Sequence, residues 1–581
     1  MADDVGAGRR VAVDTAADAL VEALRAAGVE LIFANLGTDH PPLIETLAKF
    51  HALGRPAPKI IQCPHESVAL SAAHGFAQVT GRPQVVLVHV DAGTANLGGA
   101  VHNAARSRIP VLILAGRTPF TERGELKGSR DSYVQFLQDV YDQSGIVRPY
   151  VKWEYELHRG ANIGLVVQRA LRLAVADPGG PVYLTAPREV LEEPIDAVDL
   201  PDPASSVPPV PTIPDGAALR QIARWLRAAE RPVAVTSYIG RRAAAVGALV
   251  ALADQLALPV AEMLPRAYMN FPTDHPLYLG AGWHPRLGTA DLVLVVDCDV
   301  PWIPSAAQPA AGARIIHLDL DPVKEDLPLW MFPAHLSARV DAAATLSCLV
   351  EELRCGWTPD VEARVDGRRR ALEDEAGARR TAWRDAAPPP PPGGPITAAW
   401  LTRWLGGILP PDAIAVTELV THAPETARHL PRSLPGSLLS AGGTSLGWGL
   451  GASIGVKLAR PEAEVVCLVG DGSFLFGVPS AALWTSRRYH APFLAIIYNN
   501  RGWAAAKNAT RRQHPSGYAV RGGEFLSSFG EGVDFAAIAA GAGGYGERVV
   551  RPEDVPAAVD RARRAVREGQ TAVLDVTITP V

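Results

Sequence analysis

The chain has 581 residues, too many for one hydrophobic core, so three or four domains are expected. Apolar residues make up 48% of it and charged residues 20%, which is the composition of a globular protein rather than a disordered one. The formal net charge is −5 with acids and bases interspersed, so no basic stripe favours nucleic acid as a partner.

The N-terminal stretch "MADDVGAGRRVAVDTAADAL" lacks the apolar segment of a signal peptide. The longest apolar runs, such as "VVLVHV" and "LVLVV", have the length of strands and are too short to cross a membrane. The five cysteines are scattered and are not spaced as metal-binding pairs, which favours buried, reduced thiols. We therefore expect a cytoplasmic protein that does not bind membranes.

Two proline-rich stretches divide the chain. Residues 194–216 and the shorter run 387–395 ("APPPPPGGP") are expected to be extended, solvent-exposed linkers. They leave an N-terminal domain over 1–193, a central domain over 217–386 and a C-terminal domain over 396–581, each of ordinary domain size.

Each of the three blocks repeats one pattern: a short β-branched run, a turn with glycine, a helical stretch and the next apolar run. "QVVLVHV" and "PVLILAG" are such runs in the first block, "ADLVLVVDCDV" in the second and "EVVCLVGDG" in the third. Strands that alternate with helices predict an α/β fold of three doubly wound domains with mostly parallel sheets. Ligands of such sheets bind beyond the carboxyl ends of the strands.

Polar residues follow two successive strands of the last block. The strand "VVCLV" leads into Gly470, Asp471 and Gly472, and "FLAIIYNN" ends in Asn499 and Asn500, with 26 residues between the two motifs. Gly-Asp-Gly alone is a common turn, and Asn-Asn alone says little. Together, at the tips of adjacent strands, they predict a binding site.

A metal and a diphosphate fit this pair of motifs. Glycines let an anion approach the main chain, and the N–H groups of Gly472 and Ser473 could hold phosphate oxygens. Since phosphate would be repelled by a bare Asp471, a divalent cation has to lie between them. Mg²⁺ prefers oxygen ligands, and Asn500 and Gly502 offer a side-chain and a main-chain carbonyl.

This spacing resembles the thiamine diphosphate enzymes, and the resemblance covers nearly the whole chain. "LGWGLGASIGVKLA", "CPHESVALSAAHGFAQVTGRP" and "DAGTANLGGAVHNAARSRIPVLILAG" look like benzoylformate decarboxylase and acetolactate synthase. The resemblance implies a pyrimidine-binding, a central and a diphosphate-binding domain, in that order. It also implies a cofactor bound between subunits, hence a homodimer or homotetramer, and Asp471, Asn500 and Gly502 as the metal ligands.

The resemblance assigns further cofactor contacts. Glu66 in "CPHESVAL" matches the glutamate that holds the aminopyrimidine ring, although an ordinary glutamate at the start of a helix would look the same. Leu446 falls at the position of an apolar wedge between the cofactor rings, and the carbonyl of Thr444 would accept from the amino group. Glu418 and Thr421 in "TELVTHA" are candidates for lining the diphosphate.

His89, at the end of "VVLVH", matches a proton-relay histidine of benzoylformate decarboxylase, and Thr38 matches a serine there that touches the substrate. A histidine at a strand tip is a reasonable general acid near neutral pH, although a structural role is also open. The other candidates for the substrate pocket are His40, Trp302, Trp503 and Ala505. His65 is a further candidate, and His102 is interpreted as structural.

Two departures from the family pattern concern the substrate and a second cofactor. The second histidine of the decarboxylase has no counterpart; near that region the sequence reads "CDVPWIPS", with Trp302 as the notable side chain. The middle block has no glycine fingerprint for a flavin nucleotide, which argues against FAD.

The leading hypothesis is an enzyme dependent on thiamine diphosphate and Mg²⁺ that decarboxylates a 2-oxo acid and protonates or carboligates the resulting enamine. His89 and Thr38 favour simple decarboxylation, whereas the overall likeness to acetolactate synthases favours carboligation. A thiamine diphosphate-binding relative without catalysis, and a carbon–carbon lyase or carboligase acting on another carbonyl substrate, are the alternatives. No Gly-x-Gly-x-x-Gly follows a strand, which argues against a nucleotide-binding dehydrogenase.

Overall fold

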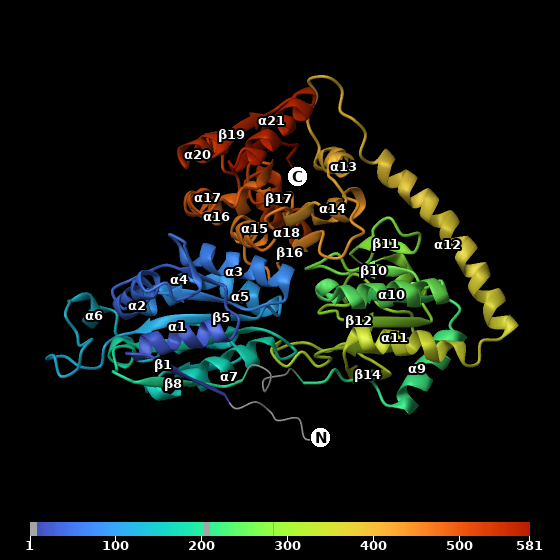
Figure 1. Ribbon diagram of the computed structural model, residues 1–581. Coiled ribbons are helices and arrows are strands. Elements are labelled where there is room, and N and C mark those ends of the chain that lie inside the picture. The colour runs from blue at the N-terminus through green and yellow to red at the C-terminus, as the bar shows by residue number, and fades with distance from the viewer. Residues whose placement is uncertain (1–7, 203–208, 283, 531, 581) are drawn as a thin grey trace.

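The computed structural model describes residues 8–202, 209–282, 284–530 and 532–580. It contains three six-stranded parallel sheets covered by helices, which confirms the predicted fold class. In Figure 1 the N-terminal domain (blue) and the central domain (green to yellow) lie side by side, and the C-terminal domain (orange to red) lies above them.

The sheet of the N-terminal domain has the order β3-β2-β4-β5-β7-β6. Its strands are β3 (Lys59–Gln62), β2 (Leu31–Ala34), β4 (Gln84–Val88), β5 (Val111–Arg117), β7 (Pro181–Pro187) and β6 (Glu154–Glu156). Its helices are α1 (Ala16–Ala26), α2 (Pro41–Ala52), α3 (Glu66–Thr80), α4 (Val90–Asn96), α5 (Gly98–Arg106), α6 (Val134–Leu137), α7 (Ile163–Val175) and α8 (Arg188–Leu191). Strands β4, β5 and β7 are almost wholly buried, as expected for a parallel sheet covered on both faces.

The central sheet has the order β11-β10-β9-β12-β13-β14. It consists of β11 (Tyr278–Ala281), β10 (Val260–Glu262), β9 (Pro232–Thr236), β12 (Leu292–Val296), β13 (Arg314–Asp319) and β14 (Leu336–Arg339). Helices α9 (Gly216–Ala228), α10 (Ala243–Leu256) and α11 (Ala342–Arg354) belong to this domain. The 27-residue helix α12 (Pro359–Asp385) then runs along the outer edge of the molecule to the C-terminal domain (Figure 1).

The C-terminal sheet has the order β16-β15-β17-β18-β20-β19. Its strands are β16 (Leu438–Ser440), β15 (Ile414–Glu418), β17 (Val465–Gly470), β18 (Leu494–Asn499), β20 (Ala572–Thr577) and β19 (Tyr545–Val549). Its helices are α13 (Ala398–Ile408), α14 (Ala423–His429), α15 (Trp448–Ala459), α16 (Asp471–Phe476), α17 (Pro479–Arg488), α18 (Ala504–Gln513), α19 (Tyr518–Gly522), α20 (Phe535–Gly541) and α21 (Val555–Arg567).

The first proline-rich stretch differs from the expected exposed linker. Its beginning forms β8 (Ala197–Leu200), which pairs antiparallel with β1 (Arg9–Ala12) and buries Val198 and Leu200. Residues 203–208 of that stretch lie outside the described residues. The pairing could not be read locally because it joins segments nearly 190 residues apart. The residue boundaries of the three domains stay predictions.

The cysteines also differ in part from expectation. All five are free, and Cys63, Cys298 and Cys467 are buried as predicted, but Cys348 is half-buried and Cys355 is exposed. No helix within the described ranges combines the length and apolar character needed to cross a membrane.

Helices α3 and α15 bring the N- and C-terminal domains into backbone contact. A Cβ atom added at Gly455 would lie 1.8 Å from the carbonyl oxygen of Ala72, and one at Gly75 would lie 2.2 Å from that of Ala452. Glycine is therefore required at both positions, because no side chain fits between the two helices.

Gly455→Ala is expected to lower the free energy of unfolding by about 1–3 kcal/mol, because the new methyl group meets main-chain atoms that cannot move aside. The melting temperature should fall accordingly. Gly247→Ala in α10 is the matched control, since a Cβ there meets nothing within 4 Å. It should be neutral or slightly stabilising, and equal melting temperatures of the two variants would contradict the packing argument.

Candidate functional site

The Gly-Asp-Gly and Asn-Asn motifs meet at the carboxyl edge of the C-terminal sheet. Strands β17 and β18 are paired in parallel, with Gly470 opposite Tyr498. The backbone N–H of Gly502 lies 2.9 Å from Oδ2 of Asp471 and 3.2 Å from Oδ1 of Asn500. The structure thus brings together the three residues predicted as metal ligands.

The chemistry of this group fits Mg²⁺, which takes hard oxygen ligands and commonly only one or two carboxylates. Asp471 is 3% exposed, and burial raises the pKa of its carboxyl group, against the N–H groups of Gly472 and Gly502. A cation beside it would offset the cost of that buried charge. Asn499 is engaged elsewhere, since its amide donates to Asp575 at 2.7 Å.

Gly472 lies directly against the side chain of Trp503. A Cβ atom there would lie 2.5 Å from the indole nitrogen of Trp503, which packs edge-to-face on Phe529. Ser473 is buried beside it, and Ala505 is exposed on the first turn of α18. Of the predicted pocket residues, Trp503 and Ala505 therefore lie next to the three predicted metal ligands.

Glu418, at the end of β15, has both carboxylate oxygens engaged. Oε1 accepts from the N–H of Gly447 at 2.6 Å and Oε2 from that of Gly449 at 2.7 Å, at the start of α15. Burial raises the pKa of Glu418 to about 7, against these N–H groups and the Ser473 side chain. The structure thus gives Glu418 a helix-capping contact, and Thr421 follows it in a half-buried turn before α14. Whether either lines a diphosphate stays a prediction.

Glu66 is the first residue of α3, at the tip of β3, and is 6% exposed. Its Oε2 accepts from the amide of Asn96 at 3.1 Å, a contact that the sequence did not suggest. His65 caps the same helix, because its Nδ1 accepts from the N–H of Ser67 at 3.2 Å. This contact assigns His65 a structural role.

A cavity of about 290 Å³ lies between the starts of α3 and α15 in the same chain. Leu446 lines it together with His65, Asn96 and Phe476. Thr444 lies two residues before Leu446 and contacts α5: its N–H and its hydroxyl group are each 3.2 Å from Nε2 of His102. His102 therefore supports the loop that carries both predicted cofactor contacts.

His89 follows β4, and Asp39 reaches it from the loop after β2. Nδ1 of His89 is hydrogen-bonded to Oδ1 of Asp39, and its Nε2 lies 2.9 Å from the amide nitrogen of Gln138. His40 is buried, with Nε2 at 3.3 Å from Oδ2 of Asp39. Thr38 is exposed in the same loop, and its carbonyl accepts from Arg188 at 3.2 Å.

Asp39 and Gln138 are residues that sequence reasoning missed. Asp39 stands between the candidates Thr38 and His40, in the loop after β2. Its place after a strand tip is the one sequence signal that points to a functional role. Gln138 comes from the segment after α6, which carries no motif.

Trp302 does not join the other candidates. It is 3% exposed and packs edge-to-face on Phe332 in an apolar core of the central domain. Its side chain faces that core because the segment around it covers the central sheet.

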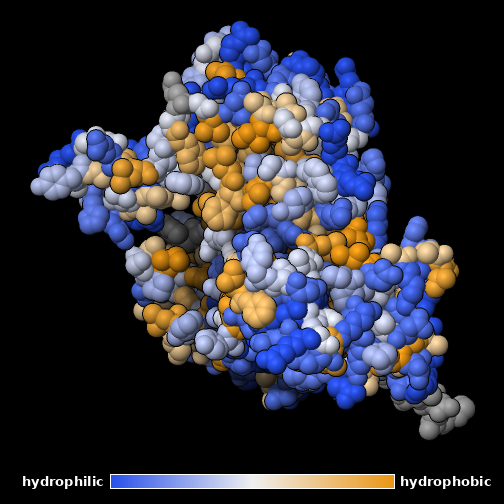
Figure 2. Space-filling model, turned by 90° about the vertical axis from the view of Figure 1, so that its left-hand side faces the viewer, coloured by the Kyte–Doolittle hydropathy of each residue, from blue (hydrophilic) through white to orange (hydrophobic). Residues whose placement is uncertain are grey.

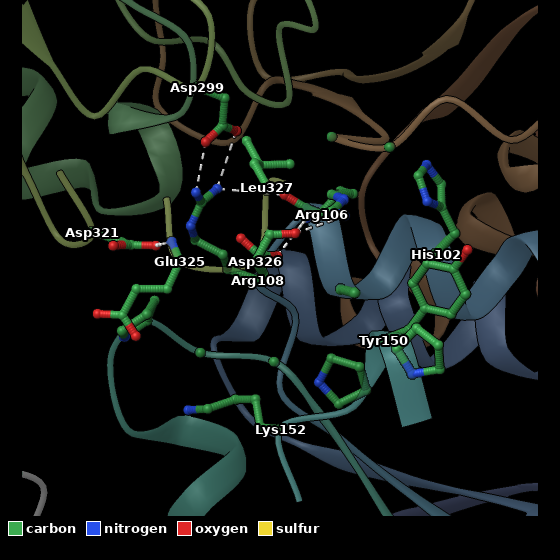
Figure 3. Close-up of a pocket in the computed structure, with 18 of the residues that line it drawn as sticks. His102, Arg106, Arg108, Tyr150, Lys152, Asp299, Asp321, Glu325, Asp326 and Leu327 are labelled. Atoms are coloured by element: carbon green, nitrogen blue, oxygen red, sulfur yellow. Dashed lines mark hydrogen bonds and ion pairs between the residues drawn. The ribbon is translucent and has the colours of Figure 1, made fainter. Parts of the chain in front are cut away.

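A second cavity of about 450 Å³ lies where the three domains meet (Figure 3). Two arginines of this cavity contact carboxylates: Arg108 pairs with Asp299 at 2.6 Å, and Arg106 is hydrogen-bonded to Asp326. Lys152 points to the carbonyl oxygens of Leu173 and Ala176.

Beside this cavity, buried side chains lie near the carboxyl ends of β9 and β13. Lys324, 1% exposed, donates to the hydroxyl of Tyr238 at 2.9 Å and to Asp319 at 2.9 Å. The strand order changes direction between β9 and β12, and nucleotides bind at such a point in open α/β sheets. The expectation that FAD does not bind stays a prediction.

Three domain models of one family match the chain in the predicted order. The N-terminal thiamine pyrophosphate-binding domain matches residues 14–146, the central domain 219–349 and the C-terminal thiamine pyrophosphate-binding domain 420–576. The chain belongs to the thiamine pyrophosphate enzymes. Glu66 and His89 lie within the matched N-terminal domain, and Asp471 and Asn500 lie within the matched C-terminal domain.

Curated relatives extend over the full chain. A benzoylformate decarboxylase of Pseudomonas aeruginosa is 28% identical over 579 residues, covering 97% of this chain and 100% of the relative. An acetolactate synthase large subunit of Mycobacterium tuberculosis is 27% identical over 566 residues, covering 96% and 94%. The solved 4-hydroxybenzoylformate decarboxylase of Rhodococcus jostii shares the fold, with a TM-score of 0.77 at 24% identity over 98% of this chain and 99% of that one.

Proposed function

We propose that this member of the thiamine pyrophosphate enzymes binds thiamine diphosphate with Mg²⁺ and decarboxylates a 2-oxo acid. The observation that carries the proposal is the convergence of Asp471 and Asn500 on the N–H of Gly502, at the tips of two adjacent strands. The decarboxylases and acetolactate synthases among the relatives support the reaction class.

In this proposal the predicted site residues divide into those that hold the metal, the diphosphate and the rings of the cofactor. Asp471, Asn500 and the carbonyl of Gly502 hold the metal, while the N–H groups of Gly472 and Ser473 face the diphosphate. Glu66 holds the aminopyrimidine ring, and Thr444 and Leu446 position the cofactor. When bound, the thiazolium accepts the electron pair that carbon dioxide leaves behind.

His89 then supplies the proton that replaces carbon dioxide on the substrate carbon, which favours release of an aldehyde. A histidine suits this task because it can change charge near neutral pH. Thr38, exposed in the loop beside it, is proposed to contact the substrate.

The test is to supply benzoylformate and pyruvate separately to the protein loaded with cofactor and Mg²⁺ and to identify the products. We expect carbon dioxide and an aldehyde. An acyloin product would instead assign carboligation of the acetolactate synthase type. If the protein with cofactor and Mg²⁺ bound shows no proton exchange at thiazolium C2, catalysis is contradicted and a non-catalytic relative is favoured.

We further propose that the protein works as a homodimer or homotetramer in the cytoplasm. Large apolar side chains, among them Phe476 at 58% and Trp484 at 41% exposure, remain on its surface. Figure 2 shows apolar patches across the face turned to the viewer. Light scattering that gives the mass of a single chain would contradict the oligomer, and recovery in a membrane or secreted fraction would contradict the location.

A further inference from the structure

Asp39 is a buried carboxylate placed directly against the imidazole of His89. It is 3% exposed, and its Oδ1 is hydrogen-bonded to Nδ1 of His89. Its Oδ2 accepts from the N–H of Val90 at 3.1 Å, so the main chain next to His89 is tied to the same carboxylate. Asp39 thus fixes both the ring and the backbone at the tip of β4.

Two glycines make room for this pair. A Cβ atom at Gly37 would lie 2.1 Å from Nδ1 of His89, and one at Gly116 would lie 1.6 Å from Oδ2 of Asp39. Val90 has a φ of +28°, which is strained for a β-branched residue. The contact between Asp39 and His89 thus requires glycine at two positions and a strained backbone at a third, which is typical of a functional site.

Three other groups lie near the pair, namely His40, Asp91 and Arg188. His40 accepts from the N–H of Gly37 at 2.9 Å through Nδ1, so that nitrogen carries no proton, and burial lowers the pKa of His40. A neutral His40 therefore carries its proton on Nε2, which faces Oδ2 of Asp39 at 3.3 Å, whereas His89 contacts Oδ1. Asp91, in the first turn of α4, is a second carboxylate near His89, and Arg188 donates to the carbonyls of Thr38, Gly128 and Ser129 and contacts Asp131.

On the opposite side of the ring, Nε2 faces Gln138 at 2.9 Å. A primary amide can serve either protonation state, since it donates through nitrogen to a neutral Nε2 or accepts through oxygen from a protonated one. The main-chain carbonyl of Gln138 accepts from the hydroxyl of Thr118 at 3.0 Å, which holds the backbone at this residue. Nε2 is thus the position at which the ring exchanges its proton.

We propose that Asp39 is a positioning residue that holds His89 with Nδ1 protonated, so that Nε2 delivers the proton in the decarboxylation. This inference rests on the proposed function. The N–H bond at Nε2 breaks as the new C–H bond forms on the carbon that has lost carbon dioxide. The ring becomes neutral and keeps its proton on Nδ1, which stays hydrogen-bonded to Asp39. Nε2 then takes the next proton from water.

The electrostatics agree with this assignment. The hydrogen bond to Asp39 raises the pKa of His89 against the opposing effect of partial burial, with smaller contributions from Gln138 and Asp91. Burial opposes ionisation of Asp39, but the hydrogen bond from His89, the nearby His40 and the N–H of Val90 bring its pKa below the ordinary value. His89 is therefore the member of the pair that holds its proton to higher pH.

The test is a titration of the histidine side chains by NMR in protein labelled at histidine Cε1, with His89→Gln to assign the signal. In the wild type His89 should titrate above an ordinary histidine. Asp39→Asn should lower its pKa by about 1–3 units, because an adjacent opposite charge is lost. Asp91→Asn is the matched control and should shift it much less.

The pH profile of the decarboxylation provides the second readout. The rate requires protonated His89, so it should fall as the pH rises through the pKa of His89, and in Asp39→Asn this fall should move to lower pH by the same interval. An unshifted NMR titration in Asp39→Asn, or a wild-type His89 that titrates at or below the ordinary value, would overturn the inference. The wild-type measurement decides even if the variant does not fold.

The two proposals fail in distinguishable ways. If no 2-oxo acid is decarboxylated, the proposed function is wrong, while the NMR titration still shows whether Asp39 controls His89. If the titration shifts but the pH profile of kcat does not, Asp39 controls the ring without positioning it for the reaction, and the inference is overturned while the function stands.

Discussion

Glu66→Gln is expected to reduce proton exchange at thiazolium C2 of the bound cofactor by at least about 100-fold, the lower end of what a positioned acid–base group contributes. Glu66 is 6% exposed at the start of α3, and the amide of Asn96 holds it at 3.1 Å. Glutamine keeps the shape of the side chain but has no acidic proton to share with the aminopyrimidine ring.

The measurement is hydrogen–deuterium exchange at C2, followed by NMR after acid quenching of the loaded protein. Cofactor affinity should change much less than the exchange rate, because the diphosphate is proposed to bind elsewhere, at the tip of β17. Glu45→Gln, at an exposed position of α2, serves as the control and should exchange like the wild type. Wild-type exchange in Glu66→Gln would remove Glu66 from the proposed site.

Asp471→Asn is expected to weaken Mg²⁺-dependent binding of thiamine diphosphate by more than about 100-fold. Oδ1 of Asp471 accepts from the N–H of Gly472 at 2.7 Å and Oδ2 from that of Gly502 at 2.9 Å, so the amide keeps one of these two hydrogen bonds and loses the other. The fold should therefore persist. What is lost is the negative charge, and Mg²⁺ binds proteins chiefly through carboxylates and substrate phosphates.

Calorimetric titration with thiamine diphosphate, with and without Mg²⁺, measures this effect. Asp534→Asn provides a matched control in the same domain, because Asp534 caps α20 through the N–H of Ala537 at 2.8 Å and asparagine caps helices equally well. Its affinity should stay within twofold of the wild type. If Asp471→Asn bound the cofactor equally well with Mg²⁺, the metal would have to lie elsewhere.

The sequence predicted the parts of the structure that depend on local pattern. Buried β-branched runs separated by helices indicated parallel sheets, and in parallel sheets the polar residues after each strand must gather at one edge. This pattern predicts that Asp471, Asn500 and Gly502 lie together, as they do in the structure.

The sequence could not predict contacts that depend on how loops turn. Asp39 reaches His89 because Gly37 and Gly116 leave space at two positions that are distant in the chain, and no spacing rule encodes this. Trp302 is a pocket candidate because it lies near the region of the decarboxylase's second histidine, but a large aromatic side chain also suits a core, and only the tertiary packing decides.

The contact between α3 and α15 carries a consequence for the evolution of this protein. One helix begins at Glu66 and the other at Trp448, and the two meet through main-chain atoms at Gly75 and Gly455. The distance between the N- and C-terminal domains of one chain is therefore set by peptide geometry. Loops around this contact can accept mutations without altering that distance, whereas a bulkier residue at either glycine would push the two domains apart.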